Sequence, residues 1–141
     1  MGSTKVAFVE GKVDAAAYQG ILQKHLLPVV GAFRVPWHFQ QDGATCHSAR
    51  STMAWFAANG LPPPIDWPPH SPDVSPIENL WSLMVQDVNK ENPATVDDLR
   101  KAIRGSWRAR TSDPILMENL LGGWRKRVLQ LVDAKGGRLS Y

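Results

Sequence analysis

Apolar residues recur at two spacings along this 141-residue chain, and the two spacings predict two kinds of element. In residues 35–42, Trp37 and Phe39 alternate with polar neighbours, a period of two that is typical of a β-strand with one buried face. Short apolar runs in residues 5–10 and 65–67 predict two further strands. Elsewhere, apolar residues return every three or four positions and predict helices.

Most of the predicted helices begin at a residue that can cap them. Serine or threonine followed three positions later by an acidic residue predicts a capping box, and the chain has this pattern at Ser75 with Glu78 and at Thr95 with Asp98. Two consecutive glycines, Gly122 and Gly123, are expected to weaken or bend the last helix. The predicted starts are Asp14, His47, Ser75, Thr95 and Asp113, and the predicted stops are Pro28, Gly60 and Pro93.

Strands alternating with helices predict one α/β domain over residues 1–141, with a core at 5–91 and a basic helical extension at 92–135. The chain is 43% apolar, which suits a packed core, and has no apolar run near 18 residues. We therefore expect a soluble protein with no membrane partner. One cysteine, Cys46, excludes an internal disulfide framework and suits a reducing, intracellular compartment.

Positive charge is concentrated in the C-terminal third. Residues 1–99 carry 6 basic and 10 acidic residues, a net charge of −4, whereas residues 100–141 carry 10 basic and 3 acidic residues, a net charge of +7. A basic surface of this kind suits the phosphates of nucleic acid, although a solvated helical face has the same composition. The candidate DNA-binding residues are Arg100, Lys101, Arg104, Arg108, Arg125, Lys126 and Arg127.

Two acidic residues, Asp42 and Glu78, are candidates for metal chemistry. Asp42 ends a predicted strand and precedes Gly43, a position at the rim of a sheet where ligands bind. Glu78 lies in the first turn of a predicted helix, behind a proline-rich loop. Each also has an ordinary structural explanation: aspartate before glycine is typical of turns, and glutamate at this helical position is typical of capping.

The two segments around these acids are Q-Q-D-G-A-T-C-H at residues 40–47 and W-P-P-H-S-P-D-V-S-P-I-E-N-L-W at residues 67–81. In order and separation, with 35 residues between Asp42 and Glu78, they resemble the second and third acidic motifs of mariner-type DDE transposases, of the Tc/mariner superfamily. The resemblance implies a ribonuclease H-like catalytic core in which Asp42 and Glu78 bind Mg²⁺ (or Mn²⁺). It further implies nuclear cleavage and transfer of DNA, with transposon ends and target DNA as partners.

The resemblance lacks one part of the family pattern. The first catalytic aspartate of such transposases precedes the segment that corresponds to residues 5–10, and this chain begins too late to contain it. We therefore expect an incomplete acidic triad, three strands, little activity from the chain alone, and a homodimer through the exposed sheet edge. The alternatives are a domesticated DNA-binding module without catalysis and a scaffold that binds only protein.

Overall fold

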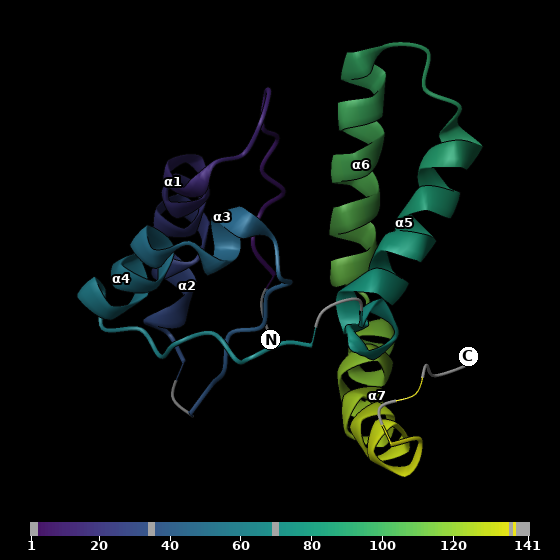
Figure 1. Ribbon diagram of the computed structural model, residues 1–141. Coiled ribbons are helices and arrows are strands. Elements are labelled where there is room, and N and C mark those ends of the chain that lie inside the picture. The colour runs from purple at the N-terminus through teal and green to yellow at the C-terminus, as the bar shows by residue number, and fades with distance from the viewer. Residues whose placement is uncertain (1–2, 34–35, 69–70, 136, 138–141) are drawn as a thin grey trace. The chain divides into compact units, whose positions relative to one another are not determined.

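The computed structural model describes residues 3–33, 36–68, 71–135 and 137. Within these ranges the regular elements are helices, and no strand is present. The chain divides into two compact units, Met1–His70 and Ser71–Tyr141, each described below by itself (Figure 1). No helix in the described ranges combines the length and the apolarity needed to cross a membrane.

The predicted α/β, ribonuclease H-like fold is wrong. Residues 5–10, 36–42 and 65–67 contain no strand, and Val35 at the start of the second predicted strand lies outside the described residues. The N–H of Ile65 donates to the carbonyl of Phe39 at 2.9 Å, so these two predicted strands do meet. A sheet, however, needs a ladder of such bonds. Because the described residues form no sheet, the predicted homodimer through a sheet edge loses its support.

The first unit is built from helices joined by irregular segments. Its first helix begins as predicted, because the Asp14 carboxylate accepts the N–H of Ala17 at 2.8 Å. The predicted stop at Gly60 also holds, since this glycine adopts a left-handed φ of +65° directly after the last helix of the unit. The helices are α1 (Ala15–His25), α2 (Leu27–Val30), α3 (Thr45–Ser48) and α4 (Arg50–Ala58).

The core of this unit forms around α4. Phe56 is 1% exposed, and its ring centroid lies 5.4 Å from that of Phe39, in the segment that precedes α3. Thr52, one turn earlier, is also buried, and its hydroxyl donates to the carbonyl of Cys46 at 2.7 Å. α4 therefore holds the segment of residues 39–47 in place through one aromatic contact and one hydrogen bond.

The second unit is a set of packed helices in which α5 and α6 lie side by side and α7 follows (Figure 1). The Thr95–Asp98 capping box forms as predicted at the start of α6, and α7 continues through Gly122 without a break. Leu80, Met84 and Leu120 form the core. The elements are η1 (Pro72–Val74), α5 (Pro76–Glu91), α6 (Val96–Thr111) and α7 (Pro114–Asp133).

The predicted apolar faces of these helices are wider than the faces that are buried. Trp81 of α5 is 50% exposed, Val96 of α6 is 64% exposed and Ile115 of α7 is 71% exposed. Each helix buries only the residues along its contact line with a neighbour. A helical period in the sequence locates the buried side of a helix but does not set its width.

An ionic cluster joins α5 to α6. The Asp87 carboxylate of α5 accepts hydrogen bonds from the Ser106 hydroxyl at 2.7 Å and from Arg110 Nε and Nη2 at 2.8 and 2.6 Å. Hydrogen bonding to Arg110, followed by that to Ser106, lowers the pKa of Asp87 from 3.8 to about 2. The paired, ionised carboxylate therefore stabilises the folded helices.

Asp87→Asn is expected to lower the thermal midpoint of unfolding at neutral pH. Because the folded-state pKa lies below the ordinary value, the contribution of Asp87 is complete above pH 3.8 and is lost as the pH falls toward 2. The wild type and the variant should therefore converge over that range in circular-dichroism melts. Asp133→Asn, at an exposed position of α7, is the control. A constant difference between the two proteins down to pH 2 would exclude this role for Asp87.

Candidate functional site

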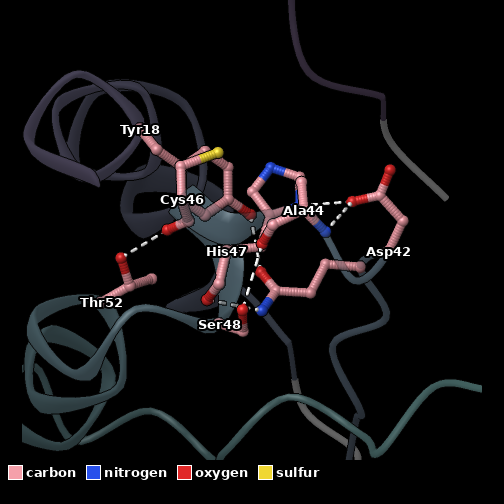
Figure 2. Close-up of polar contacts among 8 residues, drawn as sticks. Tyr18, Asp42, Ala44, Cys46, His47, Ser48 and Thr52 are labelled. Atoms are coloured by element: carbon pink, nitrogen blue, oxygen red, sulfur yellow. Dashed lines mark hydrogen bonds and ion pairs between the residues drawn. The ribbon is translucent and has the colours of Figure 1, made fainter. Parts of the chain in front are cut away.

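Asp42 lies where the segment from Phe39 turns into α3. One carboxylate oxygen, Oδ1, accepts the backbone N–H of Ala44 at 3.1 Å and contacts His47 Nδ1 at 2.6 Å (Figure 2). The bond to Ala44 has the spacing of an aspartate turn, so the structural role foreseen for this residue is real. The side chain is nevertheless 74% exposed, and within the described residues Oδ2 makes no hydrogen bond.

His47 is held on two sides. Its ring contacts Asp42 through Nδ1, and the Tyr18 ring of α1 lies 4.1 Å away between centroids, tilted by 38°. An ionised carboxylate can only accept a hydrogen bond, so the Nδ1–H group of His47 donates. The His47 side chain is 21% exposed, far less than that of Asp42. A mostly covered donor therefore fixes one oxygen of a mostly exposed carboxylate.

Tyr18 also holds the backbone of the loop. Its hydroxyl donates to Gln41 Oε1 at 2.8 Å, and Gln41 Nε2 donates to the carbonyl of His47 at 3.1 Å. Burial raises the pKa of the Tyr18 phenol above its ordinary value, and the nearby Cys46 and Asp42 raise it further. The phenol therefore remains a donor under physiological conditions. These contacts join α1 to both ends of the Asp42–His47 segment.

Glu78 lies in the first turn of α5, as predicted, but it does not cap the helix. The Ser75 side chain makes no capping hydrogen bond, and the Ser75 N–H donates to the carbonyl of Pro72 at 3.1 Å. The predicted Ser75–Glu78 capping box is therefore wrong, because the preceding turn, η1, uses the backbone donor that Glu78 would need. In the described part of the chain, no hydrogen bond or ion pair involves the half-buried Glu78 carboxylate.

Asp42 belongs to the first unit and Glu78 to the second, so their convergence on a metal remains a prediction. Among the described residues, no three His, Cys, Asp or Glu side chains lie close enough together to hold a metal ion. His70, in the segment of residues 67–81, lies outside those residues. The available carboxylate oxygens of Asp42 and Glu78 fit a hard cation such as Mg²⁺, which prefers oxygen ligands.

Three of the candidate DNA-binding residues form one stripe on α6. Lys101, Arg104 and Arg108 are exposed and follow one another at offsets of three and four residues, so they share a helical face. The buried residues Ala102 and Ser106 lie on the opposite side of the helix. We call these three residues the basic stripe.

The other basic candidates lie apart from this stripe. Arg100 is 3.6 Å from Asp97 in an ion pair within the first turns of α6. Arg125 and Lys126 of α7 are exposed, whereas Arg127 is half-buried. The basic stripe is therefore the most regular array of positive charge among the candidates.

A family model gives the class of this protein. The model described as "DDE superfamily endonuclease" matches residues 2–100, which is more than half of the chain. The chain therefore belongs to the DDE superfamily endonuclease family. Endonucleases of this family use divalent metal ions in general.

The relatives are transposases of nematode transposable elements. The chain is 30% identical over 140 residues to the Tc3 transposase of Caenorhabditis elegans, covering 97% of this chain and 42% of that protein. It is 26% identical to the Tcb1 transposase and 27% identical to the Tcb2 transposase of Caenorhabditis briggsae, covering 94% of this chain and 48% of each of those proteins. The chain thus spans less than half of each relative. The predicted resemblance to a Tc/mariner-type DDE transposase is confirmed.

Proposed function

We propose that this chain supplies Asp42 and Glu78 to a metal centre that cleaves and transfers DNA strands in the nucleus. The observation that carries the proposal is that both motif acids retain carboxylate oxygens not used in folding. Among the described residues, Oδ2 of the exposed Asp42 side chain has no hydrogen-bond partner, and Glu78 does not cap its helix. The turn at Ala44 occupies Oδ1 of Asp42, so Oδ2 is the oxygen that could bind a cation.

In this proposal, Asp42 Oδ2 and the Glu78 carboxylate bind Mg²⁺ (or Mn²⁺). Bound metal ions activate the attacking oxygen and stabilise the leaving oxygen in phosphoryl transfer. The contribution of the chain is to place its carboxylates: the turn before α3 presents Asp42, and the first turn of α5 presents Glu78. The proposed centre needs at least one further acidic ligand besides Asp42 and Glu78.

DNA is the proposed partner of the basic stripe on α6. Lys101, Arg104 and Arg108 are exposed on a face that takes no part in helix packing. Positive side chains in such an array neutralise successive phosphates of a nucleic-acid backbone and bind without regard to sequence. The stripe would therefore bind DNA through its phosphates.

If Asp42 and Glu78 share a metal, Asp42→Asn is expected to weaken Mn²⁺ binding at both residues. In the wild-type chain, adding Mn²⁺ should broaden the amide NMR signals of residues 43–45 and 77–79 together. In the variant, half-maximal broadening at residues 77–79 should require at least about tenfold more Mn²⁺, because a ligand of the shared ion has been lost. Asp133→Asn is the matched control. Undiminished broadening near Glu78 in the Asp42 variant would contradict a shared centre.

A second candidate is a non-catalytic DNA-binding module derived from a transposase. It is favoured by the placement of the basic stripe on α6, in the unit that does not contain Asp42. In that case DNA binding should be lost with the stripe, whereas Asp42→Asn should have no effect in any metal-dependent assay.

A further inference from the structure

The contact between His47 and Asp42 suggests a role for the histidine at the proposed metal centre. His47 Nδ1 lies 2.6 Å from Asp42 Oδ1, a short distance for a hydrogen bond between a ring nitrogen and a carboxylate. The same oxygen also accepts the N–H of Ala44. Both donors converge on Oδ1, and neither contacts Oδ2. The two oxygens of this carboxylate are thus distinguished by their surroundings.

A carboxylate with a single hydrogen bond can still rotate about its bond to Cβ, exchanging its two oxygens. Two donors on one oxygen, one from the backbone and one from a held ring, oppose that rotation. Side chains that hydrogen-bond a metal-binding carboxylate orient it, and their loss commonly costs metal affinity.

The ring of His47 is itself held in position. Tyr18 packs against it at 4.1 Å between centroids (Figure 2). The Tyr18 hydroxyl donates to Gln41, which in turn donates to the His47 carbonyl. Because α1 supplies Tyr18, the support comes from a helix outside the loop. The donor is therefore preorganised and does not depend on the loop alone.

We propose that His47, braced by Tyr18 and Gln41, is a positioning residue that fixes Asp42 Oδ1 so that Oδ2 is presented to a divalent cation. The inference rests on the proposed metal function and adds a residue that neither acidic motif assigns to metal binding. His47 does not touch the metal in this proposal. It acts only through Asp42.

Two variants separate the hydrogen bond from the ring contact. His47→Phe keeps an aromatic ring against Tyr18 but removes the donor, whereas His47→Asn removes the ring but retains an N–H donor at the δ position. His38→Phe, at an exposed histidine, is the control. Thermal melts establish a temperature at which all four proteins are folded, and the Mn²⁺ titrations are performed there.

The readout is Mn²⁺-induced broadening of the amide NMR signals of residues 43–45. His47→Phe should raise the Mn²⁺ concentration for half-maximal broadening by about 10- to 100-fold, and His47→Asn should restore it to within a few-fold of the wild type. His38→Phe should match the wild type.

The other outcomes distinguish this inference from the proposed function. If His47→Phe binds Mn²⁺ as the wild type does, or if His47→Asn is as impaired as His47→Phe, the positioning role is wrong while the metal centre stands. If the wild-type chain shows no broadening near Asp42 or Glu78, the proposed function and this inference both fail.

Discussion

Replacing Lys101, Arg104 and Arg108 together by glutamine is expected to weaken binding to duplex DNA by roughly two to three orders of magnitude at about 0.1 M salt. Each phosphate contact steepens the dependence of log K on log salt concentration by about 0.9. Three lost contacts should therefore reduce that slope by about 2.7. The expected loss of affinity is large because the contributions of the three contacts to the binding constant multiply.

The structure indicates that this triple substitution should remove charge without disturbing the fold. The three side chains are exposed, and the buried face of α6 around Ala102 and Ser106 is unchanged. Glutamine has nearly the helix propensity of lysine and arginine, so α6 should retain its fold. The loss of affinity should then report lost charge and not lost structure.

Fluorescence anisotropy with a labelled duplex, repeated over a salt series, measures both the affinity and the slope. The matched control replaces Lys5, Lys12 and Lys24, three exposed lysines of the first unit, by glutamine. This control removes the same net charge from elsewhere. Equal losses in the two triple variants would mean that DNA responds only to total charge and that the stripe has no special role.

Phe56→Ala should destabilise the first unit by about 3–5 kcal/mol. Phe56 is 1% exposed and packs against Phe39 and Trp55, so its removal leaves a cavity that surrounding helices can close only in part. A unit this small has a total stability of only roughly 4–10 kcal/mol. The variant should therefore lose a large share of the stability of this unit, which includes the segment that presents Asp42.

The matched control is Phe33→Ala, which removes the same side chain from a position that is 49% exposed. Phe33 makes one edge-on contact with Trp37 at 5.8 Å between centroids, so its loss should cost about 1 kcal/mol or less. Urea denaturation followed by tryptophan fluorescence measures both. Similar midpoints for the two variants would show that the core does not depend on Phe56.

The helices were predictable from the sequence because their signals are local. Asp14 and Thr95 each accept a hydrogen bond from an N–H group three residues later, so both partners of the cap lie in one short stretch of sequence. The strands were not predictable, since a strand exists only with a partner. The sequence alternates around Phe39, but the described residues do not form the ladder of hydrogen bonds that would make a sheet.

The site divides in the same way. Asp42 and Glu78 could be proposed from the sequence because the motifs that contain them have the order and spacing of a known family. The packing of Tyr18 against His47 could not be predicted, because Tyr18 is 29 positions earlier in the chain and only folding brings its ring to His47. The failed capping at Ser75 was equally hidden, since it depends on a bond to Pro72 in the turn before α5.

The ion pair between Asp87 and Arg110 affects how α6 would bind a polyanion. On the side of α6 that faces α5, Asp87 neutralises the charge of Arg110. On the exposed side, Lys101 and Arg108 keep their positive charges. The net positive charge of these residues therefore lies on one side of α6. A polyanion would be attracted to the side of α6 that carries Lys101 and Arg108. The ion pair that joins α5 to α6 therefore also determines the side from which a polyanion approaches.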